Sequence, residues 1–166
     1  LSIRERIRWD VERLIKIDRK LDANGLIYTA DDVIDEFNRY SMEYSLFNYM
    51  ESIIAKLKQN GKIRTSETYR ATLNSFKKFR RDEDIMLDCI TSEVMENFEA
   101  WHKSRGVAPN SISFYTRILR AVYNRAVEND IIENRNPFRY VYTGVDKTVK
   151  RALPLSVIKD RKSTRL

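Results

Sequence analysis

The chain has 166 residues, of which 42% are hydrophobic and 33% charged, and its 31 Lys and Arg against 24 Asp and Glu give a net charge of +7. No apolar run approaches the ~18 residues that a membrane helix needs, and the first twenty residues lack the apolar block of a signal peptide. One Cys and one His exclude a disulfide framework and a metal site built from several such ligands. We expect a soluble, basic, intracellular protein with no cofactor and no metal. Because the sequence begins with Leu1 and not with Met, we expect a fragment or a processed form of a longer chain.

The net charge hides an alternation along the chain. Residues 61–81 carry +6, residues 103–127 carry +5 and residues 139–166 carry +6, whereas residues 82–102 hold seven acidic side chains and no basic one. One interpretation is a set of solvated helix faces that balance one another. The other is a fold that gathers the basic blocks on one side to face a polyanion.

The first part of the chain predicts helices separated by turns. Apolar residues recur at helical spacing over residues 1–22, and a glycine turn follows. Thr29 is the expected N-cap of a second helical stretch, with two aspartates in its first turn, where carboxylates suit the helix dipole. That stretch runs to Asn60, with an expected break near Tyr40-Ser41. No convincing strand pattern with a period of two appears, so the sequence predicts an all-α fold.

A basic stripe marks the next predicted helix, which follows Thr65 and Ser66. Steps of four, three and four residues place one set of polar side chains on a single side of it, beside Lys78: Arg70, Asn74, Lys77 and Arg81. An ordinary solubilising helix end is the alternative interpretation, because cations also suit the C-terminal dipole.

The acidic block predicts a helix over residues 91–105 with Thr91 as its cap. Its His102 has no acid–base partner at a suggestive spacing, so we expect a half-buried structural residue and not a catalyst. Cys89 lies in an apolar stretch and is expected to be a small core residue.

The last clear helix is expected to begin at Asn110-Ser111, after a proline that suits a helix start. One side of it offers hydroxyl, guanidinium and carboxamide groups without an acid: Ser113, Arg117, Arg120 and Asn124. Arg can contact guanine through two hydrogen bonds and Asn can read adenine, so this face has the chemistry that a DNA groove requires. An irregular basic segment follows from Arg139 to Arg151.

Several short motifs in this order resemble one known family. They are Thr65-Ser66-Glu67-Thr68-Tyr69, Asn110-Ser111-Ile112, Tyr123-Asn124-Arg125-Ala126, Ile131-Ile132-Glu133-Asn134-Arg135-Asn136-Pro137-Phe138 and Lys150-Arg151-Ala152-Leu153. Together they resemble the core-binding, SAM-like domain of tyrosine recombinases, or phage-type integrases, and are most similar to integrases from mobile elements of Bacteroides-like bacteria. The resemblance covers residues 38–155.

The resemblance implies an all-α, four-helix core-binding bundle with an extra N-terminal helical segment. It divides the chain into a helical linker from a preceding arm-binding region (1–37), the core-binding domain (38–138), a basic interdomain linker (139–153) and the truncated start of a catalytic domain (154–166). In the family the second and fourth helices of the bundle face DNA. Here they match residues 66–81 and 111–128, while the acidic helices would face away or toward neighbouring subunits.

The implied function is sequence-specific binding of double-stranded DNA at a recombination core site, together with other recombinase subunits, in the bacterial nucleoid and without a membrane or a small-molecule substrate. Backbone phosphates would be contacted by cations and by hydroxyls at helix starts: Lys62, Arg64, Thr65, Ser66, Lys77, Lys78, Arg81, Ser111, Lys147, Lys150 and Arg151. Base selection would fall to Ser113, Arg117, Arg120 and Asn124, helped by Arg70 and Asn74. The residues that cut DNA in the family, including the tyrosine nucleophile, have no match here, so we expect no strand cleavage by this chain alone.

Two other functions remain open from the sequence. The acidic 82–102 and basic 61–81 blocks could pair between subunits in a helical protein–protein interaction module without DNA affinity. A helix-turn-helix repressor is the third reading, although the turn before Asn110 is long for that motif.

Overall fold

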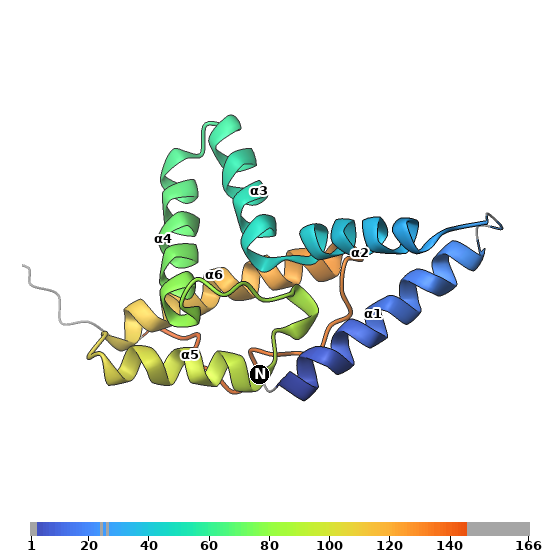
Figure 1. Ribbon diagram of the computed structural model, residues 1–166. Coiled ribbons are helices and arrows are strands. Elements are labelled where there is room, and N and C mark those ends of the chain that lie inside the picture. The colour runs from blue at the N-terminus through green and yellow to red at the C-terminus, as the bar shows by residue number, and fades with distance from the viewer. Residues whose placement is uncertain (1–2, 24, 26, 146–166) are drawn as a thin grey trace, which may run out of the picture.

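The computed structural model describes residues 3–23, 25 and 27–145. Six α-helices and one short 3-10 helix follow one another, and the described residues form no strand (Figure 1). The helices are α1 (Ile3–Ala23), α2 (Ala30–Tyr44), α3 (Leu46–Gln59), α4 (Ile63–Arg80), the 3-10 turn η1 (Leu87–Cys89), α5 (Ser92–Ser104) and α6 (Pro109–Glu128). The predicted all-α fold is confirmed. No helix in the described ranges is long and apolar enough to cross a membrane.

The core lies among α3, α4, α5 and α6. α3 and α4 form an antiparallel hairpin, α6 crosses behind α4, and α5 lies below them (Figure 1). Each helix contributes side chains that are fully buried, such as Ile54, Leu73, Phe98 and Val122, each at 0% exposure. Burying one such side chain stabilises the fold by about 1.5–3 kcal/mol. This four-helix unit therefore holds the basic helices α4 and α6 in place.

The junction between α2 and α3 lies at Ser45, four residues beyond the predicted break at Tyr40-Ser41. Ser45 leaves the helical conformation, and its hydroxyl accepts the N–H of Asn48 and donates to the carboxylate of Asp84. The same carboxylate accepts the backbone N–H of Phe47 at 3.2 Å. An acid 39 residues away thus joins the local cap at Ser45 in stabilising this break. The capping by Thr29 is confirmed, because its hydroxyl and Asp32 form a reciprocal capping box.

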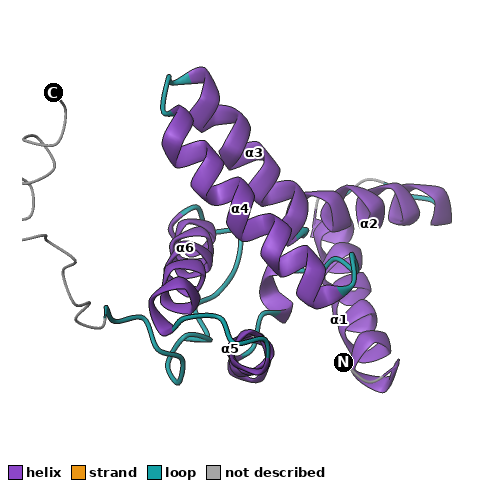
Figure 2. Cartoon of the chain, turned by 90° about the vertical axis from the view of Figure 1, so that its left-hand side faces the viewer, coloured by secondary structure: helices purple, strands orange, loops and turns teal. Residues whose placement is uncertain are grey.

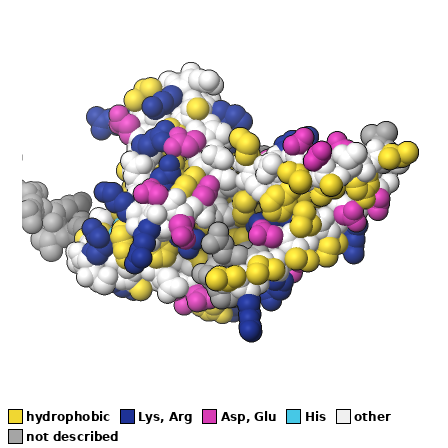
Figure 3. Space-filling model, viewed as in Figure 1, with side chains coloured by type: hydrophobic (Ala, Val, Ile, Leu, Met, Phe, Trp, Pro, Cys, Tyr) yellow, Lys and Arg dark blue, Asp and Glu magenta, His cyan; other side chains and the backbone are white. Residues whose placement is uncertain are grey.

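The helix predicted over residues 1–22 is confirmed, but most of its apolar side faces solvent. α1 pairs with α2 and is anchored to the rest of the fold by two buried residues, Arg13 and Ile17. A stripe of α1 side chains is 41–77% exposed: Ile3, Ile7, Val11 and Leu14. Figure 3 shows hydrophobic side chains gathered along α1 and α2, away from the four-helix unit.

The predicted burial of Cys89 is confirmed, and His102, which was expected to be half-buried, is buried more deeply. His102 is 4% exposed, stacks on Tyr115 with ring centroids 5.2 Å apart, and shares a 2.9 Å hydrogen bond with the Ser75 hydroxyl. Cys89 is 4% exposed, and burial raises the pKa of its thiol, which keeps it protonated and unreactive.

The chain remains packed on the bundle after α6. Phe138 and Val141 are buried in the core cluster, and the Phe138 ring meets the Tyr123 ring edge-on at 5.8 Å. The packed unit therefore reaches into the segment that the sequence interpretation assigned to an interdomain linker.

Candidate nucleic-acid interface

The two basic helices lie directly against each other. α4 packs on α6, Figure 1 shows α6 crossing behind α4, and Figure 2 shows both helices from the left-hand side of that view. The two helices are therefore close enough for one large ligand to contact both.

Most of the predicted contact residues are exposed. They are Lys62, Arg64, Thr65, Asn74, Lys78 and Arg81 in and around α4, and Ser111, Arg117, Arg120 and Asn124 in α6. None of the six cations in this set forms an ion pair with another described residue. An exposed cation that is not held in an ion pair remains available to a polyanion. Lys147, Lys150 and Arg151 lie outside the described residues.

Two predicted contacts on α4 are already engaged by an acid from α3. The guanidinium of Arg70 forms a hydrogen-bonded ion pair with Glu51, and the Lys77 amine lies 3.8 Å from the same carboxylate. The Lys77 amine also lies 5.2 Å from the centroid of the Phe47 ring. Glu51 thus neutralises part of the basic stripe, and both cations are half-buried.

The predicted role of Ser66 as a phosphate ligand at a helix start is wrong. α4 begins at Ile63, so Ser66 lies inside its first turn, is 0% exposed, and donates its hydroxyl to the Ile63 carbonyl oxygen at 2.6 Å. Its backbone N–H is bonded to Lys62. Ser111 also has an engaged N–H, because α6 begins at Pro109 and that N–H bonds to the Ala108 carbonyl at 2.9 Å.

The prediction that Ser113 contacts DNA bases from α6 is wrong. Ser113 is 0% exposed, and its hydroxyl donates to the backbone carbonyl of Gly144. The chain after the bundle returns over the start of α6 and covers this position. Arg117, Arg120 and Asn124 remain exposed on the same helix face.

Sequence reasoning missed one further exposed arginine. Arg139 lies in the loop after α6, next to a groove that Arg120 and Asn124 also line. The signal was present in the run from Asn134 to Arg139, which holds two carboxamides, two arginines and no acid. The sequence interpretation used this run only as part of a family resemblance.

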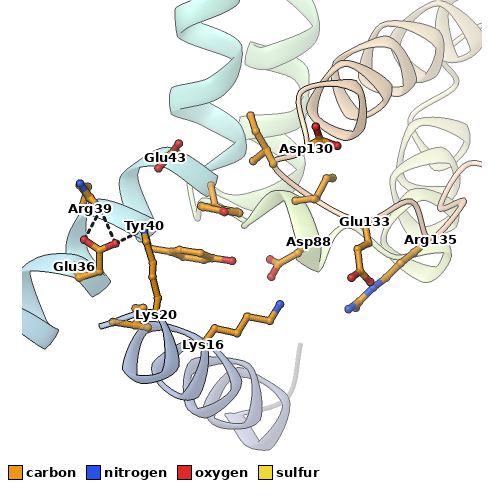
Figure 4. Close-up of a pocket in the computed structure, with 14 residues that line it drawn as sticks. Lys16, Lys20, Glu36, Arg39, Tyr40, Glu43, Asp88, Asp130, Glu133 and Arg135 are labelled. Atoms are coloured by element: carbon orange, nitrogen blue, oxygen red, sulfur yellow. Dashed lines mark hydrogen bonds and ion pairs between the residues drawn. The ribbon is translucent and has the colours of Figure 1, made fainter. Parts of the chain in front are cut away.

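A separate pocket of about 360 Å³ lies between α1, α2 and the loop after α6 (Figure 4). Its carboxylates outnumber its cations, and Lys20 pairs with Glu36 at 2.8 Å. Figure 4 shows the side chain of Arg135 reaching into it beside Glu133. A pocket with this balance of charges does not attract a polyanion, so we leave it out of the interface.

Comparison with known proteins gives the class. Residues 45–143, more than half of the chain, match the Phage integrase SAM-like domain, and the chain belongs to that family. These domains form a non-catalytic, N-terminal part of tyrosine recombinases, or integrases. No curated protein and no solved structure matches the chain. The matched range begins at the Ser45 junction and includes all four bundle helices and the loop that carries Arg139.

Proposed function

We propose that this chain binds double-stranded DNA at a recombination core site, as the core-binding domain of a tyrosine recombinase from a mobile element of Bacteroides-like bacteria. Family membership supports an integrase role. The observation that carries DNA binding is the exposed, unpaired set of cations on two adjoining helices, α4 and α6, within the described part of the chain. The protein would act in the bacterial nucleoid, together with other recombinase subunits.

The exposed residues suggest a division of work on the duplex. Lys62, Arg64, Lys78 and Arg81 would contact phosphates, which gives affinity without sequence preference. Arg117 and Asn124 would reach base edges from α6, and Asn74 would help from α4. Lys147, Lys150 and Arg151 would add phosphate contacts from the segment after residue 145. Ser66 and Ser113 have no part in this interface, because both are buried.

A duplex titration across salt concentrations tests this proposal. Half a dozen phosphate contacts give a slope of about −5 when the logarithm of affinity is plotted against the logarithm of salt. Arg117→Ala should cost about 1–3 kcal/mol of discrimination between selected and scrambled duplexes, whereas Lys78→Ala should weaken both equally. Arg125→Ala, on another side of α6, is the matched control. A flat salt slope, with no loss on Arg117→Ala, overturns the proposal.

A second candidate is a helical interaction module without DNA affinity. The exposed apolar stripe of α1, which includes Ile7 and Val11, favours it, because such surfaces often mark contacts with other proteins. Sedimentation with and without a duplex separates the two functions. Self-association that is unchanged by DNA, with no co-sedimenting duplex, supports the module instead.

A further inference from the structure

A groove beside the DNA-facing side of α6 carries cations but no acid. It has a volume of about 700 Å³ and lies between the second half of α6, the start of α5 and the loop that follows α6. The polar residues that line it include Arg120, Asn124, Asn134, Asn136, Arg139 and Ser92. Three other hollows in the described part of the chain each contain at least two carboxylates. This groove therefore differs from the other three because its lining favours a negatively charged ligand.

The walls of the groove are fixed by internal hydrogen bonds. The Tyr123 hydroxyl, on a side chain only 1% exposed, donates to the Glu133 carbonyl at 3.2 Å and accepts the N–H of Arg135 at 3.0 Å. The side-chain oxygen of Asn134 accepts the N–H of Asn136 at 2.9 Å, and Asn136 adopts a positive φ of 49° that holds the turn. A binding site that is ordered beforehand loses less entropy when its ligand arrives.

The arginines of the groove are free to bind a ligand. Neither Arg120 nor Arg139 forms an ion pair within the described residues, and Arg139 lies 5.2 Å from the ring of its neighbour Tyr140. Guanidinium groups bind phosphate oxygens through paired hydrogen bonds, and carboxamide N–H groups add further donors. The chemical class that this set fits is a phosphodiester.

We propose that this groove binds the sugar-phosphate backbone of the duplex next to the bases that α6 reads. The proposal rests on the proposed DNA-binding function and deepens it. Arg120 and Asn124 lie both on the groove and on the exposed face of α6, so a backbone in the groove is continuous with that face. Arg120 is then a phosphate ligand and not a base reader, and Arg139 joins the interface.

The salt dependence of DNA binding tests the groove. Each lost phosphate contact reduces the slope by about 0.9, so Arg139→Ala should flatten it by about one unit and weaken two unrelated duplexes by the same factor. Arg125→Ala removes the same charge from α6 outside the groove, and we expect it to change the slope by less than about half a unit. Equal changes of the salt slope in the two variants would contradict phosphate binding in the groove, but they would not contradict DNA binding by the chain.

A second measurement does not depend on duplex binding. A titration with inorganic phosphate against chloride, at constant ionic strength, is followed through the NMR signals of the arginine Nε–H and asparagine amide groups. We expect shifts at Arg120, Arg139 and Asn136 that saturate together, with none at Arg125. Shifts spread evenly over all exposed arginines, or none in the groove, overturn the proposal whether or not the chain binds DNA. If those shifts occur while the duplex titration is flat, the proposed DNA binding fails but the anion site stands.

Discussion

The guanidinium of Arg13 lies 3.3 Å from the carboxylate of Asp88, which stands 75 residues further along the chain. Arg13 is 6% exposed, pairs also with Asp10 at 2.9 Å, and donates to the sulfur of Cys89 at 3.2 Å. This contact attaches α1 to the turn before α5. The other attachments of α1 are its pairing with α2, which includes the ion pair between Lys20 and Glu36, and the buried side chain of Ile17.

Replacing Arg13 should therefore release α1. Arg13→Met keeps the apolar stem but leaves the partly buried Asp88 without its partner, and breaking a buried ion pair costs about 3–5 kcal/mol. We expect faster cleavage within α1 by trypsin, monitored by mass spectrometry, while the bundle melts nearly as before. Arg19→Met on the exposed side of α1 is the control. Equal cleavage rates in both variants would show that Arg13 does not hold the helix.

Removing Glu51 should strengthen DNA binding. Glu51→Gln frees Arg70 and Lys77 from their shared acid, and it also removes a negative charge beside the duplex. We expect several-fold tighter binding and a salt slope steeper by about 0.9, at a stability cost of about 1 kcal/mol or less, because the pair is partly exposed. Glu12→Gln on α1 removes the same charge at an exposed site in a different helix. Weaker binding by Glu51→Gln would place these two cations outside the interface.

His102 should make the fold less stable in mild acid. Burial, helped by the nearby positive charge of Arg105, lowers the pKa of His102 below its ordinary value of 6.5. The unfolded chain then binds a proton more readily than the folded one, so stability falls as the pH drops through 6.5 toward the lowered value. Urea unfolding between pH 7.5 and 5 measures this. His102→Gln should have a flatter profile over that range, and an unchanged profile would contradict the assignment.

The Tyr123 hydroxyl should matter for binding although it is buried. Tyr123→Phe keeps the packing on Phe138 but removes the hydrogen bonds to Glu133 and Arg135. We expect a cost of about 1 kcal/mol, seen as a fall in Tm of roughly 2–4 °C. The looser loop should also weaken duplex binding. Tyr115→Phe, nearer the N-terminal end of α6, serves as the comparison. Similar duplex affinities for the two variants would argue against a groove wall that is fixed by the Tyr123 hydroxyl.

Local patterns in the sequence predicted most of the bundle. The helical spacing of apolar residues and the caps at Thr29 and Thr91 depend on neighbours within four residues, and both caps are found in the structure. The break at Ser45 was predicted four residues too early, and one of the contacts that stabilise it comes from Asp84, 39 residues away, which no local pattern shows. Arg13 was not singled out for the same reason, since its partner Asp88 is distant in sequence.

The candidate nucleic-acid interface could also be predicted only where it depends on local patterns. Spacing alone placed Arg117, Arg120 and Asn124 on one exposed face, because that face depends only on the helix. It could not reveal that Gly144 covers Ser113, or that Glu51 from another helix holds Arg70. The whole groove around Arg139 depends on how the loop after α6 folds back, which no helical period describes.

The bond from Ser113 to Gly144 also fixes where the chain leaves the domain. The departing segment is fastened to the first turns of α6, the helix that carries Arg117 and Arg120. Any movement of the first turns of α6 would therefore carry the backbone at Gly144 with it, so the segment from Val141 to Gly144 belongs mechanically to the bundle.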